Sequence, residues 1–235
     1  MTDSARHEPT LLDPVDTFSP LTRPSMRPSR PVQVPAPDQV LPEPGRASIR
    51  TPRMLLRPLR EADRDAWIAA YDRSRSHLAD FLPLGSDAAT TPAIFDRQLE
   101  LTSQGDDTGR AFRRIAVDLG TGDLLGAFNL VTIRRGLEFE ADFSLWLTAD
   151  ALGRGLAREG LTALASYSFA DLPDGLGLVK LVGWICPDNQ RSQRLVTDCG
   201  FDRDGNESTH LSTGDRWKLH ERWEARVDPW LAVHG

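Results

Sequence analysis

The segment from residue 142 to residue 157 constrains the fold more than any other part of this 235-residue chain. Residues 142–147 (Asp-Phe-Ser-Leu-Trp-Leu) predict a β-strand, and after a short loop residues 153–157 (Gly-Arg-Gly-Leu-Ala) predict the start of a helix. The first amides of a helix lack internal hydrogen-bond partners and the helix dipole adds partial positive charge, so such a start attracts phosphate. The two glycines let a ligand approach the backbone closely.

Residues 1–50 differ from the rest of the chain in composition. They hold ten of the 17 prolines, one Phe and no Trp or Tyr. Such a segment cannot bury enough apolar surface to offset the entropy of ordering it. We predict a disordered Pro-rich tail over 1–50 and one folded domain over 51–235. Translation from Met26 or Met54 would shorten or remove the tail, and whether the tail binds a partner is left open.

Charge and apolar patterning restrict the class of protein. The net charge of −6 lies entirely in residues 51–235, because residues 1–50 carry six Arg and six acidic residues. This acidity disfavours nucleic-acid binding and suits an amine substrate, although solubility explains it equally well. No apolar run reaches the ~20 residues that span a bilayer. We therefore expect a cytoplasmic protein without a membrane segment. Cys186 and Cys199, the two cysteines of the sequence, do not have the spacing of metal ligands.

The hydrophobic periodicity predicts a mixed α/β (α+β) domain, a sheet covered by helices. A helix begins with Thr91 as its capping residue and is expected to stop at 105–107. In the strand over 137–147, Glu138, Glu140 and Asp142 share a face with Trp146. The predicted strands are 54–59, 114–119, 124–134, 137–147, 178–186, a strand from 201 and 216–226; the predicted helices are 61–80, 91–105, 153–170 and 189–199.

This order resembles the GNAT N-acetyltransferase superfamily, and within it the ribosomal-protein N-acetyltransferases of the RimJ/RimL-like type. Residues 141–147 match the group's Ala-Glu-Ile-Gly-Tyr-Trp-Leu, and residues 152–157 match Trp-Gly-Arg-Gly-Tyr-Ala. Residues 187–192 (Pro-Asp-Asn-Gln-Arg-Ser) match Pro-Asp-Asn-x-x-Ser, and residues 199–201 match Leu-Gly-Phe. The likeness runs from about residue 53 to residue 227.

The resemblance implies a mostly antiparallel sheet with a V-shaped split between its fourth and fifth predicted strands, 137–147 and 178–186. It implies acetyl-CoA in that split, and direct transfer of the acetyl group through a ternary complex to a primary amine of a protein N-terminus or small molecule. It is consistent with a monomer or homodimer. The implied cofactor-binding residues are Trp146, Leu147, Thr148, Leu152, Gly153, Arg154, Gly155, Leu156, Ala157, Asn189 and Ser192.

Three side chains are the catalytic candidates. Asp142 stands where the family commonly has Glu and is the expected base, with Glu140 on the same face as its substitute. Neighbouring like charges are expected to raise their pKa values and help a carboxylate accept a proton. Ser192 is the expected proton donor to the leaving thiolate, and a strand N–H near Leu145 or Trp146 is expected to meet the developing oxyanion. The plainer interpretations are solvated carboxylates and, for Ser192, a first-turn hydroxyl.

Departures from the family pattern leave alternatives open. Gly183 stands where relatives often place a Glu, and Leu145 replaces an aromatic residue. These changes favour, as the alternative, a non-catalytic acetyl-CoA-binding sensor or interaction protein of the same fold. A dinucleotide-binding domain is a weaker alternative, because Arg158 stands where its fingerprint needs a third glycine.

Overall fold

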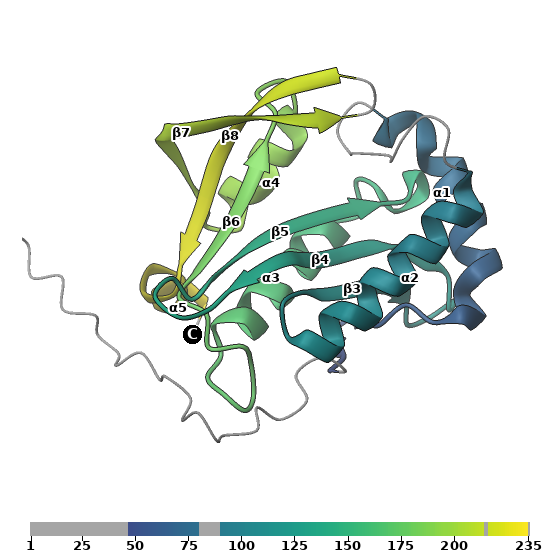
Figure 1. The fold of residues 1–235 in the computed structure, drawn as a ribbon, viewed down its shortest axis with the longest axis horizontal. Coiled ribbons are helices and arrows are strands. Elements are labelled where there is room, and N and C mark those ends of the chain that lie inside the picture. The colour runs from purple at the N-terminus through teal and green to yellow at the C-terminus, as the bar shows by residue number, and fades with distance from the viewer. Residues whose placement is uncertain (1–46, 80–89, 214–215, 235) are drawn as a thin grey trace, which may run out of the picture. The chain divides into compact units, whose positions relative to one another are not determined.

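The computed structural model describes residues 47–79, 90–213 and 216–234 (Figure 1). Residues 1–46, most of the predicted tail, lie outside this part. A short edge strand, Ile49–Arg50, lies directly before the predicted domain start at residue 51. The elements in order are β1(Ile49–Arg50), β2(Met54–Arg57), η2(Glu61–Asp63), α1(Arg64–Leu78), α2(Thr91–Thr108), β3(Phe112–Asp118), β4(Leu124–Arg134), β5(Glu140–Leu147), η3(Ala149–Ala151), α3(Leu156–Phe169), β6(Lys180–Ile185), α4(Gln190–Asp198), β7(Asp202–Thr213), β8(Arg216–Arg226) and α5(Val227–His234).

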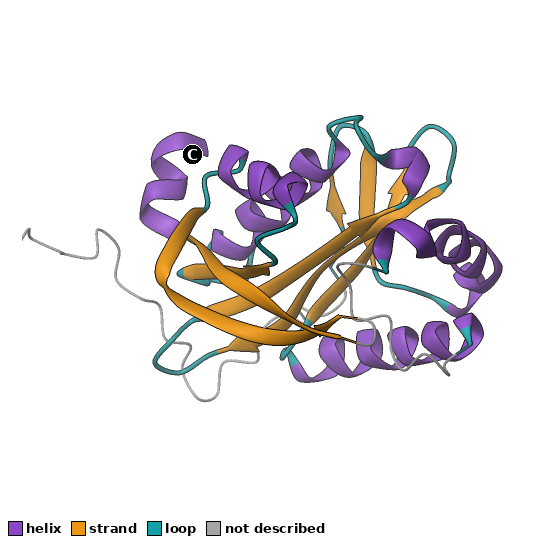
Figure 2. Cartoon of the chain, turned by 90° about the horizontal axis from the view of Figure 1, so that it is seen from above, coloured by secondary structure: helices purple, strands orange, loops and turns teal. Residues whose placement is uncertain are grey.

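The described strands form one 8-stranded sheet in the order β1-β2-β3-β4-β5-β6-β8-β7. Every neighbouring pair is antiparallel except β5 and β6, which are parallel. Helices α1 and α2 cover one face, and α3, α4 and α5 cover the other (Figure 2). The predicted mixed, mostly antiparallel sheet flanked by helices is confirmed.

Strand β5 packs against apolar residues on both of its faces. Ala141 and Leu147 point into the core beneath α3, whereas Trp146 points to the aromatic cluster under α1 and α2. In that cluster the rings of Trp67 and Tyr71 each lie edge-on to Trp146, with centroids 6.2 and 5.7 Å away. These contacts fix the direction of β5 from both sides.

The sheet opens between β5 and β6, as predicted for the fourth and fifth strands of the sequence. The two strands pair only where Glu140–Asp142 face Lys180–Val182, and beyond that point they diverge (Figure 1). On its other edge β5 stays paired with β4 as far as Leu147. One edge of β5 therefore has its backbone free of strand pairing for most of its length.

Two boundaries of α2 differ from the prediction. Thr90, not Thr91, is the capping residue, and its side chain accepts a hydrogen bond from the amide of Ala93. The helix continues through residues 105–107 and ends at Gly109, whose φ of +65° is left-handed. Gly105 lies inside the helix, where glycine is ordinarily unfavourable. A larger residue would not fit at this position, because a Cβ would lie 2.9 Å from the Cβ of Ala111. The sequence pattern also missed α5.

Packing between α3 and the sheet predicts the effect of one substitution. A Cβ at Gly160 would lie 2.2 Å from Cζ of the buried Phe128. Gly160→Ala is expected to lower the free energy of unfolding by about 1–3 kcal/mol, although alanine favours a helix over glycine by about 1 kcal/mol. Urea unfolding followed by circular dichroism measures this. Ser166→Ala, on the exposed side of α3, is the control and should change the free energy of unfolding by less than about 0.7 kcal/mol, toward higher stability; a stabilised Gly160→Ala would contradict the close packing.

Candidate active site

The glycine-rich start of α3 presents unpaired backbone amides. Gly153 and Gly155 have φ values of +73° and +76°, a left-handed conformation that side-chain-bearing residues disfavour. Gly155 is the N-cap of α3 and supplies no side-chain cap. Within the described residues, the amides of 153–157 have no hydrogen-bond acceptor. This is the geometry of a backbone anion site.

The side chains next to these amides serve other purposes. Leu156 is fully buried in the core, and Leu152 is half-buried and packs against the same core. Arg154, expected among the cofactor-binding residues, lies 3.5 Å from the carboxylate of Asp118. The pKa of Asp118 is lowered by hydrogen bonds from two turn amides and by Arg154.

Arg53 supplies a cation at this site that no sequence pattern pointed to. Its Nη1 donates to the carbonyl of Arg154 at 2.8 Å, and its Nε contacts Glu159 in the first turn of α3 at 2.6 Å. Burial acts to raise the pKa of Glu159, but hydrogen bonds from Thr51 and Arg53 outweigh it and the pKa is lowered. The Arg53 guanidinium therefore joins the glycine-rich loop to the first turn of α3 and places a positive charge beside the loop amides.

The backbone of β5 has defined directions at the split. The amide of Thr148 donates to Leu125 of β4 at 2.8 Å. Because hydrogen-bonding positions alternate in an antiparallel ladder, Trp146 also points its amide at β4, and Leu145 and Leu147 point theirs into the split. Of the two predicted oxyanion donors, Leu145 is the one whose N–H faces the opening.

His77, which sequence patterns did not single out, reaches the same edge from α1. Its Nε2 lies 3.0 Å from the carbonyl oxygen of Leu147, which identifies Nε2 as the protonated, donating nitrogen. The contact occupies one carbonyl of β5 at the open end of the split. Sequence spacing could not reveal it, because the two residues are 70 positions apart.

On the opposite side of the split, α4 begins as predicted. The side-chain oxygen of Asn189 accepts a hydrogen bond from the amide of Ser192 at 3.0 Å, so Asn189 is the helix cap. Ser192 is half-buried in the first turn, and its hydroxyl has no protein partner within the described ranges.

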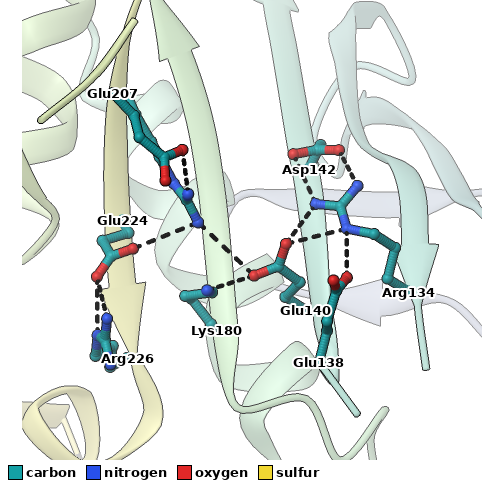
Figure 3. A network of polar contacts seen from close by, with 9 residues as sticks. Arg134, Glu138, Glu140, Asp142, Lys180, Glu207, Glu224 and Arg226 are labelled. Carbon is teal, nitrogen blue, oxygen red and sulfur yellow. Dashed lines mark hydrogen bonds and ion pairs between the residues drawn. The ribbon is translucent and has the colours of Figure 1, made fainter. Parts of the chain in front are cut away.

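The candidate base residues lie at the closed end of the split, among cations (Figure 3). Arg134 of β4 binds Asp142 at 2.6 Å and Glu140 at 2.7 Å. Lys180 of β6 contacts the other oxygen of Glu140 at 2.5 Å, and Arg222 of β8 lies 3.7 Å from it. Both carboxylates are therefore ion-paired rather than free.

The expectation of a raised pKa is wrong for Glu140. Burial acts to raise the pKa of Glu140, but hydrogen bonds from Lys180 and Arg134, with their positive charges, outweigh it and lower the pKa. The expectation counted only the neighbouring carboxylate of Asp142. It failed because the cations come from three other strands that converge on Glu140 in the folded sheet.

Comparison with known proteins identifies the fold family. A family model described as acetyltransferase (GNAT) domain matches residues 53–202, more than half of the chain. The chain belongs to the GNAT acetyltransferase family. It is accordingly an acyltransferase. The predicted transfer of an acetyl group to an amine is confirmed, and so is the predicted RimJ/RimL-like type. Nothing in the comparisons supports the non-catalytic alternative.

Individual relatives are distant but cover the domain. Ribosomal protein uS5-alanine N-acetyltransferase of Escherichia coli K12 is 24% identical over 174 residues, 73% of this chain and 87% of that protein. Mycobacterium smegmatis RimJ, solved with CoA-disulfide, has a TM-score of 0.67 at 18% identity, covering 80% of this chain and 93% of that one. Spermidine N-acetyltransferase from Vibrio cholerae, solved with CoA and spermine, has a TM-score of 0.61 at 20% identity, covering 76% and 98%.

Two further observations apply only to residues 47–79, 90–213 and 216–234. No helix in these ranges is both long and apolar enough to cross a membrane. The same ranges hold no group of three or more His, Cys, Asp or Glu residues placed to bind a metal ion.

The charge network at the closed end predicts a pH-dependent stability. Because the pKa of Glu140 is below its ordinary value of 4.5, the folded state favours its charged form, and this stability is present above pH 4.5 and lost as the pH falls through the lowered pKa. At pH 7, Glu140→Gln should lower the free energy of unfolding by about 2 kcal/mol, and the difference from wild type should shrink below pH 4.5.

Glu138→Gln is the matched control for urea unfolding at both pH values. Glu138 contacts the same Arg134 at 3.2 Å, but its side chain is 58% exposed, so its loss should change stability by less than about 1 kcal/mol. Equal effects of the two variants would show that burial of Glu140 does not strengthen its ion pairs.

Proposed function

We propose that this acyltransferase uses acetyl-CoA and transfers the acetyl group directly to a primary amine in a ternary complex. The observation that carries the proposal is the set of unpaired amides at residues 153–157, which follow β5 after the short turn η3 and lead into α3. The strand supplies an open backbone edge and the helix start supplies an anion site. A thioester on a long arm that ends in a diphosphate needs both.

The residues present fit such a co-substrate. A Cβ at Gly153 would meet no atom within 4 Å, so the space above the loop is open. We propose that the amides of 153–157, with the charge of Arg53, hold the pyrophosphate, and that the pantetheine arm runs along β5 near residues 146–148. Thr148 already donates its amide to β4, and the carbonyl of Leu147 contacts His77. This leaves the amides of Leu145 and Leu147 as the donors on that edge.

The chemistry of acetyl transfer assigns roles to a few groups. Acetyl-CoA supplies a thioester, whose carbonyl carbon forms a bond to the amine nitrogen while the C–S bond breaks. The amine must lose a proton and the thiolate must gain one. We propose that the N–H of Leu145 hydrogen-bonds the carbonyl oxygen and that Ser192, whose hydroxyl has no partner among the described residues, gives the thiolate its proton.

The identity of the base stays a prediction, and the contacts weaken the case for Asp142 and Glu140. A base must reach its proton within hydrogen-bond distance or through one water. Asp142 precedes Leu145 by three positions, about 10 Å along a strand, and both of its oxygens contact Arg134. We propose that these carboxylates fix Arg134 and Lys180, and that the amine reacts in its neutral form after losing a proton to water.

The acceptor is an amine. We propose either a protein N-terminus, as the name of the uS5-alanine N-acetyltransferase states for that relative, or a small-molecule amine, as the name of the spermidine N-acetyltransferase states for that one. Location in the cytoplasm and a monomeric or homodimeric state remain predictions.

Paired glycine variants test the binding of acetyl-CoA. Gly153→Ala and Gly122→Ala impose the same left-handed strain, with φ values of +73° and +78° and open space at both positions. Each should lose about 1 kcal/mol of stability. Only Gly153→Ala should weaken CoA binding, by tenfold or more in calorimetry. Release of the CoA thiol from acetyl-CoA is then measured with peptides, spermidine and aminoglycosides as acceptors. Equal CoA affinity in the two variants would overturn the proposal, and so would the absence of thiol release with every amine.

The role of Asp142 is tested by the pH dependence of the rate. If the amine supplies its own neutral form, Asp142→Asn should lower kcat/KM by less than tenfold, and the acidic limb of its pH profile should follow the pKa of the acceptor amine. A loss of 10³-fold, within the range typical of a general base, together with a vanished acidic limb, would instead identify Asp142 as the base.

A further inference from the structure

A small cavity lies between the sheet and helices α1 and α2, on the face opposite the glycine loop. Its volume is about 30 Å³, which is room for a water or one small functional group and not for a whole substrate. Its lining combines aromatic walls with polar groups: Trp67, Gln98, Thr102, Arg113, Asn129 and Trp146.

Arg113 is the charged residue of this cavity that lacks an anionic partner. Burial lowers the pKa of its guanidinium, and nearby Arg97 lowers it further. Its Nε is fully buried without a hydrogen-bond partner, and Nη1 has only a long contact of 3.4 Å to Gln98. No carboxylate of the described residues lies within ion-pair distance of Arg113. Arg113 is half-buried, and a partly buried cation without a counter-ion is costly.

Two other half-buried arginines of the sheet, Arg57 and Arg134, are paired with carboxylates. Arg57 binds both oxygens of Asp63 at 2.7 Å, and Arg134 binds Asp142 and Glu140. The Nε edge of a guanidinium can donate two parallel hydrogen bonds to one carboxylate. In Arg113 the Nε of this edge has no hydrogen-bond partner among the described residues. The site is therefore complementary to a planar anion that the described residues do not supply.

The register of the sheet connects this cavity to the reaction site. Arg113 of β3 lies opposite Asn129 of β4, and Asn129 lies opposite Ser144 of β5. Two strand spacings therefore separate Arg113 from β5 next to Leu145, about 10 Å. Trp146, a residue of β5, is part of the cavity lining.

We propose that Arg113 binds a carboxylate of the acceptor, about 10 Å from the reacting amine, and thereby selects acidic peptide N-termini over polyamines. This inference rests on the proposed function. At about 3.3 Å per extended residue, the carboxylate belongs to an Asp or Glu at the second or third position of the peptide. A polyamine places a cation at the same distance, next to Arg113, and is disfavoured.

Kinetics test the proposal with peptide pairs that differ only in Asp or Asn at the second or third residue. Wild-type protein should have a KM about tenfold lower for the Asp peptide. Arg113→Gln should remove that difference by raising the KM of the Asp peptide, with kcat and the KM of the Asn peptide unchanged. Arg110→Gln removes the same charge from an exposed position just before β3 and should leave the preference intact.

A second measurement does not require acetyl transfer. The ¹⁵N-labelled full chain is titrated with succinate and, separately, with inorganic phosphate, and the indole N–H signals of Trp67 and Trp146 are followed. Succinate should shift both signals in wild type and neither in Arg113→Gln. Arg113→Gln should also keep or raise the urea midpoint, because it removes an unpaired buried charge while an amide still reaches Gln98.

The outcomes separate the two proposals. If no amine is acetylated but succinate shifts the signals through Arg113, the proposed function fails and the carboxylate site stands. If peptides are acetylated without any Asp preference, or if Arg113→Gln leaves the preference unchanged, the carboxylate site is wrong. Shifts by phosphate alone, or a higher kcat/KM for spermidine than for the Asp peptide, overturn it as well.

Discussion

The parallel pairing of β5 with β6, only three residues long, is the constraint on which the rest of the structure depends. It joins Glu140–Asp142 to Lys180–Val182 and then ends. A longer pairing would close the sheet and leave no backbone edge for a ligand. A shorter one would leave β6, β8 and β7 without a connection to the first half of the sheet.

Charge stabilises this short joint from the α1–α2 face. Lys180 and Arg222 on one side and Arg134 on the other all contact Glu140, whose side chain is 9% exposed. A single buried carboxylate thus bridges strands from both halves of the sheet, and the surrounding cations offset the cost of its burial. The short pairing of β5 with β6 therefore accounts both for the rigid closed end of the split and for the unpaired backbone of β5 at its open end.

Features with a local cause could be predicted from the sequence. The glycine-rich helix start at residues 153–157 and the Asn189 cap depend on residues within four positions, whereas the split was implied by the resemblance to the GNAT family. The contacts of Arg53 and His77, and those of Glu140 with Lys180 and Arg222, could not be predicted, because the partners are far apart in the chain; Arg53 and Arg154 are 101 positions apart. The lowered pKa of Glu140 was missed for the same reason, since each cation around it is brought there by sheet register.

Gly183 shows how one substitution changes the options of a neighbouring strand. A Cβ at this position would lie 2.5 Å from the ring of Phe143, which crosses from β5 and packs on Phe201 with centroids 5.1 Å apart. Unless that ring turns away from Phe201, a carboxylate on β6 and an aromatic ring on β5 exclude each other. In this chain the space beside Gly183 is filled by the ring of Phe143, so an apolar contact, and not a titratable group, lies at this point between β5 and β6.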